Sequence, residues 1–276
     1  MSNIFIHQIF YNEATKGLLE PGFIPLDNQK NERPDWFEFW VILNFLRNTP
    51  LQDNAWYGFV SPKFREKTGL QASVVIKAVK SHGHLADVVL MSPSWDQIAY
   101  YLNPWEQGDA WHPGLTAMSQ YFLNQVGIAV DLRTLVTDSD TSVYSNYIVA
   151  KKDFWMKWLA LAEKLFAMFE NSNTDLCQFP ENTSYGSKDF QYPMKTFIQE
   201  RLATLILATG RYKTLKFNQT LNAPMLKPMF GTSATNLRLL QTCELLKAKY
   251  REKSDPAYLE MYWKIRQDVQ YTPPRH

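Results

Sequence analysis

The chain begins with the apolar run Ile4-Phe5-Ile6-His7-Gln8-Ile9-Phe10-Tyr11, whose isoleucines and phenylalanines favour a buried, central β-strand. Residues 55–61 and 87–91 have the same character and predict a second and a third strand. The segments between and after them show helical spacing of apolar residues. This alternation predicts an α/β fold with a mainly parallel central sheet flanked by helices.

A helix is expected to open at Pro34, with Asp35 and Glu38 forming a capping box ahead of an apolar stripe. The polar segment 172–192 is expected to be a loop or lid. Further strands are predicted at 143–150 and 212–217, and further helices at 73–82, 95–102, 115–126, 153–171, 196–209, 235–250 and 256–269.

Composition narrows the class of protein. Of the 276 residues, 45% are hydrophobic and 20% are charged, which excludes general disorder. The mean hydropathy is −0.33, and no apolar run approaches the roughly 20 residues that span a bilayer. Residues 1–10 lack the pattern of a secretory signal, and two cysteines, Cys177 and Cys243, exclude a disulfide scaffold. A cytoplasmic protein is therefore expected.

The net charge of +2 conceals an asymmetry, because residues 195–276 carry 14 Lys and Arg but only 6 Asp and Glu. A basic C-terminal third can face phosphates, nucleic acid or an anionic membrane surface. The alternative is that its densest run, Lys247, Lys249, Arg251 and Lys253, lies on a solvated helix. No nucleic-acid motif accompanies the charge, so no nucleic-acid partner is expected.

Several motifs are absent from the sequence. No glycine-rich phosphate loop and no G-x-S-x-G occur, which argues against common nucleotide-cofactor enzymes and serine hydrolases. Three cations, Lys63, Arg65 and Lys67, follow the second predicted strand and could neutralise a diphosphate, or could form a solvated loop.

Two acidic residues and one histidine are further candidates. Asp138 and Asp140 follow an apolar stretch at the spacing of a divalent-cation site, and also at the spacing of a turn in which both carboxylates accept backbone N–H groups. His112 lies between Trp111 and Pro113 and is either a general base or a helix-capping residue.

An ordered set of segments resembles bacterial glycosyltransferase-like proteins of capsule and O-antigen gene clusters. The segments cover most of residues 4–217 and are 23–28, 33–36, 56–59 with 63–64, 87–90, the stretch to 112, 145–155 and 197–202.

The resemblance implies a single Rossmann-like domain of the GT-A type over residues 1–217, with a helical C-terminal extension over 218–276 packed on it. It implies donor binding at the end of the first strand and in the other matching segments. It also implies an acceptor side formed by the strand that contains Asn146 and by a later helix. The donor-binding residues on this reading are Gln8, Tyr11, Asp27, Asn28, Tyr57, Lys63, Lys67 and Asp87, and the acceptor-side residues are Trp111, Asn146, Glu200 and Arg201.

The activity that the resemblance implies is transfer of a sugar from a nucleotide-sugar donor to a lipid-linked glycan acceptor in bacterial surface polysaccharide synthesis. Asp138 and His112 are the expected catalytic residues. Mn²⁺ or Mg²⁺ held by Asp138 and Asp140 is one expectation for the cofactor, and a metal-free site is the other, because Ser92-Pro93 stands where the family type carries its Asp-x-Asp. The basic third would approach the inner-membrane surface. The alternative is a non-catalytic protein of the same fold that binds a sugar or nucleotide.

Overall fold

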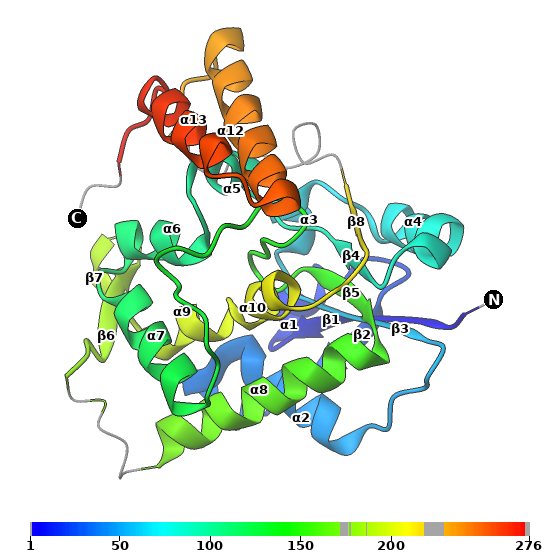
Figure 1. Ribbon diagram of the computed structural model, residues 1–276. Coiled ribbons are helices and arrows are strands. Elements are labelled where there is room, and N and C mark those ends of the chain that lie inside the picture. Colours follow the sequence, from blue (N-terminus) through cyan, green and yellow to red (C-terminus); the bar gives the residue numbers. More distant parts are fainter. Residues whose placement is uncertain (1, 172–175, 177, 186, 218–228, 274–276) are drawn as a thin grey trace. The chain divides into compact units, whose positions relative to one another are not determined.

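The computed structural model describes residues 2–171, 176, 178–185, 187–217 and 229–273 (Figure 1). Cys177 lies outside these residues. The chain forms two compact units, each built from three segments. Unit 1 comprises Met1–Pro93, Val143–Thr174 and Gln199–Pro224; unit 2 comprises Ser94–Ser142, Asp175–Ile198 and Met225–His276.

This division differs from the predicted boundary at residue 217. Strands from the middle of the chain pair with strands near its start, and the two C-terminal helices pack on a helix that begins at Trp95. The amino-acid composition does not change at the points where the chain passes from one unit to the other, so the sequence did not indicate them.

Unit 1 contains a six-stranded sheet in the order β2-β1-β3-β5-β4-β8. All neighbours pair in parallel except β5, which is antiparallel to both β3 and β4. The α/β class and the mostly parallel sheet are therefore confirmed. The strands are β1 (Ile4–Phe10), β2 (Ile24–Asp27), β3 (Trp56–Val60), β4 (Val88–Leu90), β5 (Ile148–Lys151) and β8 (Thr214–Lys216).

Both faces of this sheet are covered, which explains why its strands are continuously apolar. On one face Phe59 of β3 packs edge-on against Trp155 at 4.9 Å between ring centroids. On the other face Val75 and Val79 join Ile6 and Val149 in a buried cluster. Figure 1 shows α2 and α8 on one side of the sheet and α4 on the other. The helices of unit 1 are α1 (Glu13–Lys16), α2 (Phe37–Asn48), α3 (Phe64–Thr68), α4 (Ala72–His82), α8 (Lys152–Glu170) and α10 (Leu202–Thr209), with 3-10 turns η1 (Pro34–Trp36) and η2 (Gly83–Leu85).

The predicted capping box at the start of α2 is wrong. Asp35 accepts two hydrogen bonds from the Arg33 guanidinium instead, at 2.9 and 2.8 Å. A short 3-10 turn precedes the helix, and the N-cap residue is Trp36, which makes no side-chain cap. Glu38 therefore does not take part in a capping box at the start of α2.

Unit 2 is mainly helical. Its elements are α5 (Trp95–Tyr100), α6 (Pro104–Trp111), α7 (Leu115–Gln125), α9 (Met194–Gln199, whose last residue belongs to unit 1), α12 (Ala234–Lys253), α13 (Pro256–Gln267) and a β6–β7 hairpin (Asn182–Tyr185, Ser187–Pro193). The hairpin lies within the segment that was predicted to be a loop. The predicted helix 196–209 is broken into α9 and α10 around Glu200-Arg201.

Helices α12 and α13 pack side by side and on α5 (Figure 1). Their apolar residues enclose Trp95, Ala99 and Leu102 in one cluster with Cys243 and Tyr262. The predicted solvated face is only partly exposed. Lys247 is completely buried, and the Arg251 guanidinium lies 2.5 Å from an Asp138 carboxylate oxygen.

No helix among the described residues is long and apolar enough to cross a membrane.

Candidate functional site

The carboxyl ends of β1, β2, β3 and β4 lie at one edge of the unit 1 sheet, because these strands are mutually parallel in direction. The antiparallel strand β5 instead brings its amino end, and the residues before it, to this edge. Ligands of open α/β sheets bind outside this edge. We define the carboxyl-edge cluster as the polar side chains gathered there from unit 1: Glu38, Ser61, Lys63, Lys67, Ser145, Asn146, Tyr147 and Glu200.

The centre of the cluster is the junction between β3 and β5. The hydroxyls of Ser61, just after β3, and Tyr147, just before β5, lie 2.5 Å apart. Lys67 Nζ donates to Ser145 Oγ at 3.2 Å and lies 5.8 Å from the centroid of the Tyr147 ring. These contacts hold an ammonium group over the end of the sheet.

Two residues before β5 adopt an unusual backbone. Ser145 and Asn146 have φ values of +59° and +53°, in the left-handed region that side chains other than glycine seldom occupy. The turn delays the start of the predicted strand 143–150, which in the structure spans only Ile148–Lys151. It also buries Asn146 Oδ1 without a hydrogen-bond partner among the described residues. Strained backbone and an unpaired buried acceptor are both typical of functional sites.

The charges of both lysines and of Glu200 act on the Glu38 carboxyl group. The pKa of Glu38 is raised to about 7, mainly by burial; the charge of Glu200 also raises it, and the charges of Lys67 and Lys63 oppose the rise. Burial also raises the pKa of Tyr147, with the charge of Glu38 as the next cause. Tyr147 therefore stays a neutral phenol, and Glu38 can exchange a proton near neutral pH.

The two lysines differ from Arg65, which lies between them in sequence. Arg65 forms an ion pair with Glu20 at 3.1 Å, so its charge is already compensated. Lys63 is exposed at the start of α3, and its N–H donates to Ser61 Oγ at 3.2 Å. Among the described residues, neither Lys63 nor Lys67 forms an ion pair. Both charges remain available to an anion.

The predicted donor residues divide into two groups. Tyr11, Asp27 and Asn28 lie at the same edge as Lys63 and Lys67, where β1 and β2 end, and Tyr11 is 41% exposed. Gln8 is also near this edge but completely buried. Its side chain binds the carbonyls of Leu18 and Ser61 and accepts from the N–H of Glu20, so it supports the edge from within.

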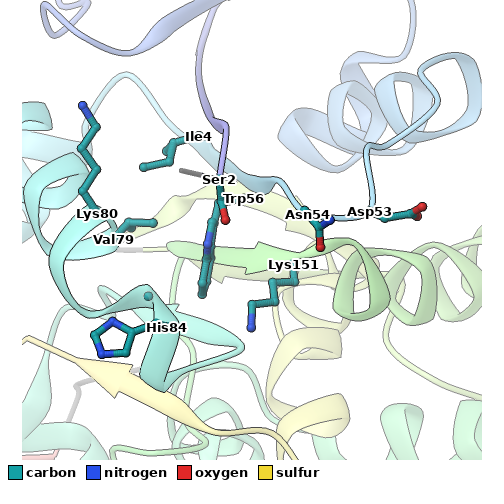
Figure 2. Close-up of a pocket in the computed structure, with 10 residues that line it drawn as sticks. Ser2, Ile4, Asp53, Asn54, Trp56, Val79, Lys80, His84 and Lys151 are labelled. Atoms are coloured by element: carbon teal, nitrogen blue, oxygen red, sulfur yellow. The ribbon is translucent and has the colours of Figure 1, made fainter.

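Tyr57 and Asp87 lie at the opposite edge, near the amino ends of β3 and β4. The Tyr57 hydroxyl accepts from the N–H of Gln52, and Asp87 forms an ion pair with Lys151 at 3.1 Å. A pocket of about 400 Å³ opens at this edge, and Figure 2 shows Trp56 in its middle with Lys151 beside it. Because it lies at the amino edge, this pocket is not where the sheet places a catalytic ligand.

The expected acceptor-side residues are also divided. Asn146 and Glu200 belong to the carboxyl-edge cluster. Arg201 is buried at the start of α10. Trp111 lies in unit 2, against the cluster of apolar residues under α12 and α13.

The expected catalytic and metal residues lie in unit 2, where Asp138 and His112 contact other side chains of the same unit. Asp138 Oδ1 accepts from Arg251, from the N–H of Asp140 and from the hydroxyl of Thr141. The stretch forms a turn, in which the Asp138 carboxylate accepts a backbone N–H as the turn alternative expects. Three donors therefore already engage Oδ1 of Asp138, and the described residues contain no group of three potential metal ligands.

His112 is buried in unit 2. Its ring stacks on Phe197 with 3.6 Å between centroids, and Nδ1 lies 3.3 Å from Thr183 Oγ1. This environment matches the helix-capping alternative, because His112 follows α6 directly.

Sequence reasoning missed Glu38, Ser61, Ser145 and Tyr147 as site residues. Ser61 could have been found, since it follows a predicted strand directly. Glu38 was assigned to a cap, and the left-handed turn before β5 has no glycine to reveal it.

No protein-family model, curated protein or solved structure matches the chain.

Proposed function

We propose that the protein is a glycosyltransferase that moves a sugar from a nucleotide-sugar donor to a hydroxyl group of a glycan or lipid-linked acceptor. The observation that carries the proposal is the pairing of two uncompensated lysines with a carboxyl group of pKa about 7 at the carboxyl edge of the sheet. In this proposal the sugar transfer takes place in the cytoplasm and is a step in the synthesis of a bacterial surface polysaccharide.

The chemistry needs two complementary groups. Glu38, in its ionised form, takes the proton of the acceptor hydroxyl as that oxygen attacks the anomeric carbon. The bond from this carbon to the diphosphate oxygen breaks, and its electron pair leaves with the nucleotide. A base whose pKa lies near the working pH is effective at such a proton transfer.

The departing diphosphate gains negative charge, which Lys63 and Lys67 would stabilise. Ser145 and the ring of Tyr147 hold Lys67 in place, so little reorganisation is needed as the charge develops. The two lysines would then stabilise the departing diphosphate by themselves, and no step of this mechanism needs Asp138 or Asp140.

A nucleotide-binding experiment tests the proposal. UDP, GDP, dTDP and CMP are screened, with and without Mn²⁺, for a rise in melting temperature. A ligand at 100 times its dissociation constant adds about 2.7 kcal/mol to the free energy of unfolding. We expect one nucleotide to stabilise the protein, and Lys67→Met to weaken its binding by about tenfold or more, the value of a charge-assisted hydrogen bond.

Lys80→Met is the matched control, because Lys80 is exposed at the opposite edge (Figure 2). If no nucleotide changes the melting temperature at millimolar concentration, or if both lysine variants behave alike, the proposal fails. A nucleotide that binds while its sugar derivatives are neither hydrolysed nor transferred would instead indicate a non-catalytic binding protein.

A further inference from the structure

A second cavity, of about 260 Å³, lies wholly within unit 2. It is lined by residues of α6, α7 and α13 and by the loop after α7, among them Glu106, Asp109, Arg133 and Trp263. We call it the Trp263 pocket. Its volume falls below the roughly 300–1,000 Å³ of pockets for drug-sized ligands, so it suits one small ring.

Trp263 is the aromatic wall of this pocket. It is 41% exposed, whereas Trp95 and Trp105 are buried in unit 2. The Arg266 guanidinium lies over the Trp263 ring, 5.0 Å from its centroid. A large apolar ring that is held in place yet open to solvent is a surface on which a flat, partly apolar ligand can stack.

Two carboxylates of α6 are fixed beside the ring. Asp109 Oδ1 accepts from the N–H of Thr116 at 3.0 Å. Glu106 Oε1 accepts from Arg266 at 2.7 Å, and Oε2 accepts from the N–H of Leu102. Each oxygen has a second lone pair, so both groups can accept further hydrogen bonds from a ligand.

Arg133 supplies donors at the rim. It is exposed and forms no ion pair within the part of the chain that the structure describes. The charges of Glu106, Asp109, Arg133 and Arg266 balance, which disfavours a strongly charged ligand. A neutral ligand with several hydroxyl groups and one apolar face meets all of these features, and a pyranose ring has this chemistry.

We propose that the Trp263 pocket binds one uncharged sugar residue of a glycan, with its apolar face on Trp263 and its hydroxyl groups on Asp109, Glu106 and Arg133. The proposal that a sugar binds here rests only on residues of unit 2. The assignment of this glycan as the acceptor rests on the proposed transferase function.

Saturation-transfer NMR with a panel of methyl glycosides tests the proposal: glucose, galactose, mannose, rhamnose and N-acetylglucosamine, each at millimolar concentration. We expect at least one glycoside to give saturation signals. Trp263→Ala should abolish them, and Asp109→Asn should weaken binding by about fivefold or more. Leu245→Ala is the matched control, because Leu245 is an exposed apolar residue of α12 outside the pocket.

Nucleotide stabilisation is measured on the same variants. Glycoside binding that needs Trp263, with no response to any nucleotide, would leave the sugar site standing and remove the transferase. A nucleotide response with no glycoside signal, or with signals that Trp263→Ala retains, would overturn the sugar site alone. Melting curves confirm that the variants fold, and Trp263→Phe, which keeps a ring, should retain part of the binding.

Discussion

Glu38 sits in the first turn of α2, where burial and Glu200 together oppose its ionisation. As the proposed base, it must lose its proton before each transfer. We expect Glu38→Gln to lower the turnover rate by about 10²–10⁴-fold, the usual contribution of a general base, and to leave nucleotide affinity nearly unchanged. Wild-type activity should rise with pH through about 7, and the variant's residual rate should lack this rise. An unchanged rate in Glu38→Gln would exclude it as the base.

The same variant reports on Glu38 without any substrate. The pKa of Glu38 is about 7 in the folded protein and 4.5 ordinarily, so between these values the folded state holds more protons than the unfolded state. The free energy of unfolding therefore falls as pH rises from about 4.5 to 7. Glu38→Gln removes this loss and should be more stable than wild type at pH 8, by roughly 1–2 kcal/mol for a partly exposed group. Burial lowers the pKa of His7 to about 4, which acts in the opposite sense, but both proteins share it.

At the scale of single elements, Lys247 joins α12 to the end of α5. Its ammonium donates to the carbonyl oxygens of Ile98 and Tyr101, the latter at 2.6 Å. Lys247→Met would remove both of these buried hydrogen bonds together with the buried charge. We expect a net loss of about 2–3 kcal/mol in a denaturation experiment. Lys249→Met, an exposed change two residues away, should cost less than about 0.5 kcal/mol. Equal effects would show that Lys247 makes no special contribution.

Most elements were predictable because their signals are local. The run at Ile4, the stripe on α2 and Asp255-Pro256 ahead of α13 each mark an element that the structure contains. The antiparallel direction of β5 and the division of 196–209 at Arg201 depend on distant partners. Neither feature leaves a mark in the adjacent sequence.

The site was predictable to a similar extent. Lys63 and Lys67 follow the end of β3, so the sequence pattern already predicts them at the carboxyl edge of a parallel sheet, where the structure has them. Asp138 and His112 have equally suggestive sequences. Their partners Arg251 and Phe197 are far along the chain, so only the structure shows that these side chains are already engaged.

At the scale of the whole molecule, the C-terminal helices complete unit 2. The cluster that contains Trp95 and Ala99 is closed by Leu240, Cys243 and Tyr262. A chain ending at residue 217, the predicted domain boundary, would expose this apolar surface. We expect that fragment to bind the dye ANS strongly and to aggregate, whereas the full chain does not. A soluble, cooperatively melting fragment 1–217 would show instead that the extension is dispensable.

Each unit is built from three separate segments of the chain, and this affects how the protein folds while it is being synthesised. The sheet of unit 1 lacks its edge strand β8 until residue 216 has left the ribosome, and the apolar cluster of unit 2 lacks Val269 until that residue has been made. Neither unit can therefore complete its fold before these late residues have been made. Residues 95–102 wait, partly uncovered, until the residues of α12 and α13 that pack on them have been made. Slower translation would lengthen that wait.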